Sequence, residues 1–345
     1  MTKDHPRKDC VTGHCPSPAS EPGDCVRLSE GGGGAEMHAL LAELLARLRT
    51  SSEWEHQDND AAVLRTRSRD ALVFTTDSYV VTPLFFPGGD IGKIAMCGTI
   101  NDLAVMGARP FGIALSLIIE EGFPKRDLFT ILDSIKSVSE ATGVPVVTGD
   151  TKVMERGAID RIVITTSGVG SAAQPIDAPP VPGDAVIVSG TLGDHGATLL
   201  AKRFAFQTTL QTDSKPLLEE IRAVQQFVKQ AKDITRGGLA AVLNELAEQH
   251  RISMVLEEDS LPVAQETRAV TNLLGLDPLM LACEGRFVCI TAREDAAKVV
   301  RALQQFNERA AIIGRVQDGQ GVTLKTRFGA RPLQPPSGVL VPRIC

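Results

Sequence analysis

The chain has 345 residues, of which 43% are hydrophobic and 4% aromatic, and it carries a formal net charge of −6. This length predicts two domains with aliphatic cores. The acidic balance argues against nucleic acid and anionic membranes as partners, and no apolar run approaches the ~20 residues that cross a bilayer. Residues 1–8 lack the apolar core of a signal peptide, so we expect a cytoplasmic protein with reduced thiols.

The first 34 residues are rich in Pro, Ser, Gly and Asp and show no apolar periodicity, which predicts a disordered N-terminal extension. This segment holds Cys10, Cys15 and Cys25. Their spacing fits no standard zinc or redox pattern, so their role stays open.

The rest of the chain alternates helical and strand patterns. In the first part of the chain, the patterns predict a helix over 35–50, strands over 61–66 and 71–76, a loop and helix within 88–106, a strand over 111–119, a helix over 125–141, and strands over 144–148 and 159–168. A linker is expected over 174–183. After the linker, the patterns predict a strand over 185–189 and helices near 194–206, 215–230 and 238–250. This order predicts an α/β (α+β) protein with sheets and packed helices, divided into domains 35–173 and 184–328.

Residues 329–345 form a proline-marked tail that ends in Cys345. Proline disfavours helix, so we expect a flexible, extended segment that spans on the order of 50 Å. No backbone follows a terminal cysteine, so its thiol can reach deeper into a site than the thiol of an internal cysteine. The alternative is a frayed terminus whose cysteine has no function.

Four short segments place a carboxylate where a strand or loop ends. The residues are Asp60, Asp77, Asp102 and Asp150, all in the first predicted domain. Magnesium prefers such oxygen ligands and bridges them to substrate phosphates. Each residue alone is better explained as a turn or helix-capping Asp, but four in one domain favour a metal site.

Glycine-rich segments offer candidate phosphate sites. Gly31, Gly32, Gly33 and Gly34 precede the first predicted helix, so their backbone amides could approach a phosphate, although a flexible linker explains them equally well. Standard nucleotide motifs fail: segment 88–93 is one residue short of a P-loop, and Gly168-Val169-Gly170 leads into the proline linker rather than a helix.

Together these segments resemble the PurM-like ATP-binding superfamily and, within it, the HypE-type hydrogenase maturation proteins. The stretches that carry the resemblance are Thr76-Asp77-Ser78, Pro83-Leu84-Phe85-Phe86-Pro87-Gly88-Gly89, Asn101-Asp102-Leu103, Thr148-Gly149-Asp150-Thr151-Lys152, Ser189-Gly190-Thr191-Leu192-Gly193-Asp194-His195-Gly196, Asp233-Ile234-Thr235-Arg236-Gly237-Gly238, Glu284-Gly285 and Pro342-Arg343-Ile344-Cys345. The Asp motifs are shared by the superfamily, whereas the proline-phenylalanine segment and the terminal tetrapeptide are specific to this family.

The resemblance implies an ATP-dependent carbamoyl dehydratase. A HypF-type carbamoyltransferase would load Cys345 with a carbamoyl group, and the tail would then enter the protein's own active site. ATP would phosphorylate the carbamoyl oxygen, and loss of phosphate would leave a thiocyanate. The cyano group would pass through a HypC-HypD-type scaffold to the iron of a nickel–iron hydrogenase. A homodimer joined through the first-domain sheets is also implied.

The resemblance further implies a role for each matching residue. Asp60, Asp77, Asp102 and Asp150 would hold Mg-ATP, with Lys93 and Gly31–Gly34 near the phosphates. Lys152 and Glu284 would handle protons at the thiocarbamate, although Lys152 could instead clamp phosphate. Asp233, Thr235 and Arg236 would line the cleft between domains, unless Asp233 or Thr235 caps a helix. We expect His195 to be structural.

Three positions depart from the family pattern, and two other functions remain open. Glu30-Gly31-Gly32-Gly33-Gly34 replaces a His-Gly-Ser-Gly-Gly loop, Arg286 stands where Lys is common, and Cys283 where Asn is common. These changes affect how phosphate is held rather than the reaction. The alternatives are a small-molecule kinase or synthetase of the same superfamily and a cyano-group carrier without catalysis.

Overall fold

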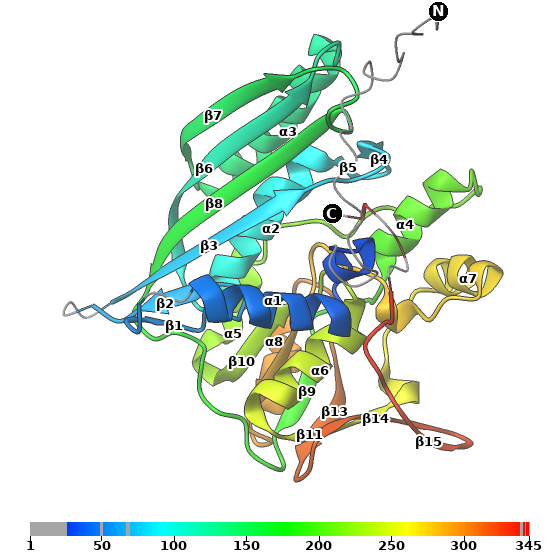
Figure 1. The fold of residues 1–345 in the computed structure, drawn as a ribbon. Helices are drawn as coiled ribbons and strands as arrows, with labels where there is room; N and C mark the ends of the chain where they lie inside the picture. The colour runs from blue at the N-terminus through cyan, green and yellow to red at the C-terminus, as the bar shows by residue number, and fades with distance from the viewer. Residues whose placement is uncertain (1–25, 49–50, 67–69, 339–340, 342, 345) are drawn as a thin grey trace, which may run out of the picture.

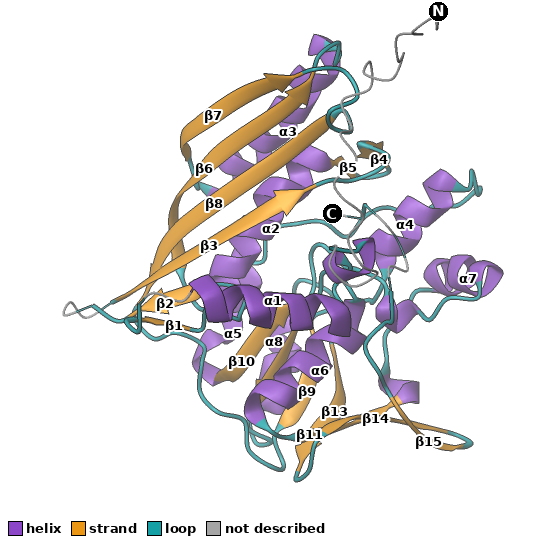
Figure 2. Ribbon diagram, in the orientation of Figure 1, coloured by secondary structure: helices purple, strands orange, loops and turns teal. Residues whose placement is uncertain are grey.

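The computed structural model describes residues 26–48, 51–66, 70–338, 341, 343 and 344. Two β-sheets with packed helices form the molecule, one sheet from each half of the chain (Figures 1 and 2). The predicted α/β architecture is therefore confirmed. Cys10, Cys15, Cys25 and Cys345 lie outside the described residues.

The first sheet has six strands in the order β1-β2-β3-β8-β6-β7. Their bounds are β1 Trp54–Glu55, β2 Ala62–Leu64, β3 Ala71–Tyr79, β6 Arg109–Glu120, β7 Val146–Met154 and β8 Ile162–Ala172. Strand β7 pairs only with β6, in parallel, so it forms one edge of the sheet. The short hairpin of β4 (Phe85–Phe86) and β5 (Gly89–Asp90) forms a separate ladder that contacts α2, α3 and α4.

One face of this sheet is covered by helices α2 (Ile91–Val105) and α3 (Lys125–Thr142) (Figure 1). Strand β8 alternates strictly between buried and half-buried residues, as expected for a sheet with one covered face. No helix of the described residues covers the opposite face (Figure 1). On the edge strand β7, residues 146–153 are exposed on both faces.

The second sheet has seven strands in the order β10-β12-β9-β13-β11-β14-β15. Their bounds are β9 Ala185–Val188, β10 Val228–Asp233, β11 Ser253–Glu257, β12 Phe287–Thr291, β13 Ala311–Gln317, β14 Gly321–Thr326 and β15 Gly329–Pro332. The helices of this half are α4 Asp194–Arg203, α5 Leu218–Val224, α6 Gly238–His250, α7 Gln265–Leu274 and α8 Ala296–Leu303. Helix α1 (Ala35–Leu48) precedes the first sheet in sequence and lies near both halves (Figure 1).

Helix α2 lies between the two halves, and nearly all of its residues are buried. An apolar surface all round is typical of a helix enclosed by protein. Asp90 caps its N-terminus by accepting a hydrogen bond from the Lys93 backbone amide at 3.0 Å. Ala104 and Val105 at the other end pack in the core of the second half. This helix therefore fixes Asp102, near its C-terminal end, between the sheets.

Most predicted elements are present, with ends that differ by a few residues, but one prediction is wrong. A helix was expected over 215–230. Helix α5 covers only Leu218–Val224, and Val228–Asp233 form strand β10, which pairs with β12 at one edge of the second sheet. Gln230 and Lys232 of β10 are buried there with polar partners, so tertiary contacts override the local helical pattern.

The described part of the C-terminal tail lies against the body. Its first four residues extend the second sheet as β15, which pairs with β14. Leu333 is fully buried, and Val341 and Ile344 are each 7% exposed. Ile344 packs in the apolar cluster that also contains residues of α2, α3 and α4. The tail thus returns from the second sheet to the junction of the two halves.

Candidate functional site

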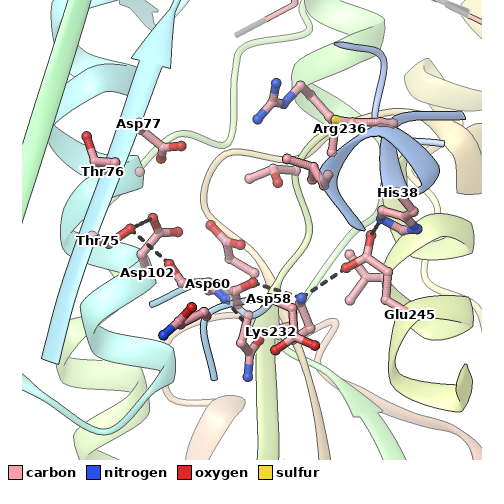
Figure 3. Close-up of a pocket in the computed structure, with 18 of the residues that line it drawn as sticks. His38, Asp58, Asp60, Thr75, Thr76, Asp77, Asp102, Lys232, Arg236 and Glu245 are labelled. Carbon is pink, nitrogen blue, oxygen red and sulfur yellow. Dashed lines mark hydrogen bonds and ion pairs between the residues drawn. The ribbon is translucent and has the colours of Figure 1, made fainter. Parts of the chain in front are cut away.

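A cavity of about 700 Å3 lies between the two halves of the molecule (Figure 3). Its walls come from β3 and α2 on one side, from the end of β10 and from α6 on the other, and from α1. The lining includes carboxylates from four separate segments, which are Asp60, Asp77, Asp102 and Asp233. The chain therefore brings together three of the four predicted metal ligands and one of the predicted cleft residues.

Hydroxyl groups orient two of these carboxylates. Thr75 Oγ1 lies 2.7 Å from Asp102 Oδ2 and 2.9 Å from the Asp60 backbone carbonyl. Tyr79 Oη donates to Asp77 Oδ2 at 2.9 Å. Thr75, Asp77 and Tyr79 alternate along β3, so their side chains lie on the same face of the strand, toward α2.

The carboxylates are crowded enough to disfavour their charged forms. Burial raises the pKa of Asp102 well above its ordinary value of 3.8, and the charges of Asp77, Asp233 and Asp60 raise it further. Burial likewise raises the pKa of Asp233, with Asp60 and Glu284 adding to the effect. A bound cation would relieve this repulsion and return the groups to their charged state.

Lys232 supplies one positive charge to the site. Its Nζ lies 3.0 Å from Asp60 Oδ1 and 2.9 Å from Glu245 Oε2, and His38 Nε2 lies 2.9 Å from Glu245 Oε1 (Figure 3). Burial acts to lower the pKa of Lys232, but Asp60 and Glu245 outweigh it and raise the value. For Glu245, burial is outweighed by Lys232 and His38, and the pKa falls to about 2. Lys232 is therefore charged.

The residues present fit a magnesium ion. Asp60 Oδ2 is buried and has no hydrogen-bond partner among the described residues, since Lys232 pairs with the other oxygen. Asp77, Asp102 and Asp233 add further carboxylate oxygens around the same cavity. Hard oxygen ligands with an unsatisfied negative charge are the donor set that Mg2+ prefers.

Three more predicted residues line the cavity, which are Glu284, Thr235 and Arg236. Asn101 on α2 fixes the loop before β12, because its Nδ2 lies 3.4 Å from the Glu284 carbonyl. Neither Asp233 nor Thr235 caps α6. The capping position is Gly237, whose φ of 79° suits glycine.

Gly31–Gly34 and Lys93 lie outside the cavity lining. A Cβ on Gly33 would lie 2.5 Å from the Arg236 carbonyl carbon, and one on Gly34 would lie 2.3 Å from the Pro336 carbonyl oxygen. Gly33 therefore packs tightly against the chain at Arg236 and Gly34 against the tail, whereas Gly31 is exposed. Lys93 Nζ donates to the Gly88 carbonyl at 2.8 Å.

Asp150 and Lys152 are not brought to the cavity within one chain. Across the sheet, Asp77 aligns with Thr166, Leu115 and Gly149 in turn, so β7 lies three strands away, about 14 Å. Because side chains alternate along a strand, Asp150 and Lys152 project to the face opposite that of Asp77. Both residues are exposed.

No motif or spacing in the sequence pointed to Lys232, Glu245 or His38. They come from β10, α6 and α1, and no short spacing connects them. Lys232 lies one position before Asp233 and was hidden in the expected helix over 215–230. Recognising β10 as a strand would have placed Lys232 at the same sheet edge as Asp233.

His195 is fully buried on α4 and outside the cavity lining. Its Nδ1 lies 2.7 Å from Thr212 Oγ1, and its Nε2 lies 3.0 Å from the Ile344 backbone oxygen. Burial lowers its pKa to about 4, so the ring is neutral at pH 7.

Two family models cover most of the chain. Residues 58–172 match the N-terminal domain of AIR synthase related proteins, and residues 181–327 match the C-terminal domain. Among the described residues, no helix is both long and apolar enough to cross a membrane.

The chain is similar to several characterised proteins. Carbamoyl dehydratase HypE of Cupriavidus necator is 42% identical over 333 residues, which cover 93% of this chain and 95% of that protein. The same-named protein of Escherichia coli K12 is 40% identical over 93% of this chain and 99% of its own length.

Solved structures agree with this similarity. A HypE–HypF complex matches with a TM-score of 0.80 and 37% identity, over 86% of this chain and all of that one. HypE in complex with ATP matches with a TM-score of 0.77 and 36% identity, over 93% of this chain and all of that one.

Proposed function

The chain belongs to the HypE family of carbamoyl dehydratases, and on this basis we propose that it dehydrates a carbamoyl group carried by its own Cys345. The product is a terminal thiocyanate, which supplies the cyanide ligand for the iron of a nickel–iron hydrogenase. The observation that carries this proposal is the burial of Ile344, one residue before the thiol, at the junction that also holds the carboxylate cavity.

The reaction consumes one ATP for each carbamoyl group. The carbamoyl oxygen attacks the γ-phosphorus, the bond to the β-phosphate oxygen breaks, and ADP leaves. The nitrogen then loses its two protons, the C–O bond breaks, and the phosphorylated oxygen departs as inorganic phosphate. The products are thiocyanate, ADP, phosphate and a proton.

The cavity supplies the groups that this chemistry needs. Arg236 provides positive charge for the transferring phosphoryl group. Glu284 is the acid on the loop before β12 and is our candidate for accepting the protons that leave nitrogen. Thr235 lies beside Arg236 and offers a hydroxyl toward the same cavity.

Asp60, Asp77, Asp102 and Asp233 would hold the magnesium of Mg-ATP. When bound, the ion supplies positive charge against the phosphate oxygens. Thr75 and Tyr79 keep the carboxylates aimed into the cavity, and Lys232 neutralises part of their charge. Lys93 and Gly31–Gly34 do not line the cavity. They remain candidates for phosphate contact near it.

We propose that two copies of the chain form a homodimer through their first sheets. The uncovered face carries exposed apolar side chains, including Phe74, Phe111 and Val147. Asp150 and Lys152 project from the same face. In such a dimer they would serve the partner's cavity, with Lys152 as base or phosphate clamp.

Other parts of the proposal concern partners, location and organisation. A HypF-type carbamoyltransferase would load Cys345, and a HypC-HypD-type complex would receive the cyano group. We place the protein in the cytoplasm. We also propose the domain division 35–173 and 184–328, joined by the linker 174–183, with 1–34 as an extension and 329–345 as the tail.

The test is the substitution Cys345→Ala. We expect this variant to bind ATP with native affinity but to take up no carbamoyl group from the carbamoyltransferase. Uptake on Cys97, Cys283 or Cys289 would contradict the proposal. Those three thiols are buried, and burial raises the pKa of Cys97 and Cys289 to about 12, so each is a poor nucleophile.

A small-molecule kinase would behave differently in the same assay. Deleting the last five residues would leave its turnover intact, whereas the proposed reaction would be lost. A cyano-group carrier without catalysis would bind ATP and release no phosphate even when Cys345 is carbamoylated.

A further inference from the structure

The backbone just before Cys345 is held by donors from both halves of the molecule. The Arg343 carbonyl accepts the Thr82 amide at 3.1 Å and Arg203 Nη2 at 2.6 Å. The Ile344 carbonyl lies 3.0 Å from His195 Nε2. We call Thr82, His195 and Arg203 the tail seat. Arg203 also donates through Nε to the Thr82 carbonyl at 2.6 Å, which links the two sides of the seat.

The hydrogen bonds fix the tautomer of His195. A carbonyl oxygen only accepts, so Nε2 carries the proton that it donates to Ile344. Nδ1 therefore accepts from the Thr212 hydroxyl, whose oxygen in turn accepts the Ser214 amide at 3.1 Å. Every donor and acceptor of the ring is used. The ring is thus locked with its donor toward the tail.

An apolar contact completes the seat. The Ile344 side chain lies against α4, because a Cβ built on Gly196 would lie 3.3 Å from Ile344 Cδ1. The same Cβ would lie 2.9 Å from Leu281 Cβ. Gly196 therefore leaves the space that the isoleucine occupies beside the loop before β12.

The seat adjoins the carboxylate cavity on two sides. Thr82 follows Tyr79, which lines the cavity, by three positions along the chain. Ala282 packs in the same cluster as Ile344 and precedes Glu284, which also lines the cavity, by two positions. Consecutive Cα atoms are about 3.8 Å apart, so the chain leaves Ile344 at this junction.

We propose that His195 and Arg203 are positioning residues, which hold the carbonyls of Ile344 and Arg343 so that Cys345 is presented to the cavity for dehydration. This inference rests on the proposed function. It assigns to His195 a role beyond packing within its own domain. It also explains why a polar, fully buried imidazole lies next to apolar residues of the tail.

The first arm of the test measures whether the seat exists in solution. Trypsin cleaves after Arg343, and a seated Arg343–Ile344 bond is protected because its carbonyl is bound. We expect His195→Ala and Arg203→Ala to release the dipeptide Ile344-Cys345 about tenfold faster than the native chain. His195→Gln retains an amide donor and should restore protection. Lys202→Ala, an exposed neighbour on α4, is the matched control.

An internal reference comes from the same digest. Trypsin also cleaves the bond between Arg327 and Phe328, and Phe328 is fully exposed. Its initial cleavage rate should be equal in all variants. A variant that has lost its fold would cleave faster at both bonds and at many others, so unfolding is distinguished from opening of the seat.

The second arm measures single-turnover dehydration of the carbamoylated chain. We expect His195→Ala to slow formation of the thiocyanate about tenfold while ATP affinity stays native, and His195→Gln to recover most of the rate. Unchanged cleavage after Arg343 would overturn the proposal, and so would unchanged dehydration in a variant whose seat has opened. If the native chain itself forms no thiocyanate, the proposed function fails instead.

Discussion

At the scale of single residues, Asp102 shows how the site stores electrostatic repulsion. Its carboxylate is buried beside Asp77, Asp233 and Asp60, so the protein without a cation bears an electrostatic cost that a bound cation would relieve. Functional sites are commonly built from groups that destabilise the empty protein. The Thr75 hydroxyl still favours the charged form, which keeps the carboxylate ready to bind a cation.

We predict that Asp102→Asn stabilises the metal-free protein by roughly 1–2 kcal/mol, because it removes a carboxyl group whose ionisation the buried cluster opposes. The same change should abolish Mg2+-dependent ATP binding. Thermal unfolding with and without Mg-ATP measures both effects. Asp318→Asn, at an exposed position, is the control and should change neither. A less stable Asp102→Asn protein that binds Mg-ATP normally would contradict this account.

The sequence predicted part of the site. Asp60, Asp77 and Asp102 line one cavity, as their position at the ends of predicted elements suggested, whereas Asp150 does not. Asp233 and Glu284, which the family resemblance implied, line the same cavity. Sequence alone could not find Lys232, Glu245 and His38, because their contacts arise only when β10, α6 and α1 pack together. It also could not show that Asp150 and Lys152 project from the opposite face of the sheet, since that depends on register.

At the scale of elements, α1 contributes to the cavity without being buried itself. Met37, Leu41 and Leu45 line the cavity from this helix, and none of its residues is buried. The ion pair between His38 and Glu245 ties the helix to α6. The Glu245 hydrogen bond raises the pKa of His38 above its ordinary 6.5, although burial and Lys232 oppose the shift.

We predict that α1 loosens as pH rises. A raised folded-state pKa means that the pair contributes fully below pH 6.5 and is lost as pH rises through the folded value. Hydrogen exchange of peptides covering 35–48 should show protection factors that fall about twofold across this range, since the pair is partly exposed. His38→Gln should give a flat profile. Equal pH dependence in both proteins would refute the role of this pair.

Strand β10 shows why one element was misassigned. Residues 228–233 are rich in Lys, Gln and Asp, which suit a helix surface. Their polar groups nevertheless find partners when the chain folds. Lys229 Nζ lies 2.8 Å from Asp184 Oδ2, and Gln230 Nε2 donates to the Ala178 carbonyl at 2.9 Å. Such partners lie far away in sequence, so local pattern could not reveal them.

At the scale of the whole molecule, the uncovered face of the first sheet separates two groups of predicted site residues. The carboxylate cavity lies on the helix-covered side, and Asp150 and Lys152 lie on the other. A symmetric dimer joined through this face would let each chain complete the partner's site. The proposed homodimer thus explains why Asp150 and Lys152 lie away from the cavity of their own chain.

Mixed dimers test this arrangement. Asp102→Asn and Lys152→Ala are each expected to be inactive as homodimers. In a heterodimer of the two, one cavity would combine a native Asp102 with a native Lys152 from the other chain. Equal mixing should therefore restore about one quarter of native dehydration activity. No recovery after subunit exchange, confirmed by mass, would show that each site is built within one chain.

The central claim is that Cys345 carries the substrate and that this protein dehydrates it. The most direct measurement is intact-protein mass spectrometry after incubation with ATP, carbamoyl phosphate and the carbamoyltransferase, with mapping of the tryptic peptide Ile344-Cys345. The account predicts a gain of about 43 Da followed by an ATP-dependent loss of about 18 Da on that peptide. An unmodified Cys345, with ATP consumed against another added metabolite, would contradict it.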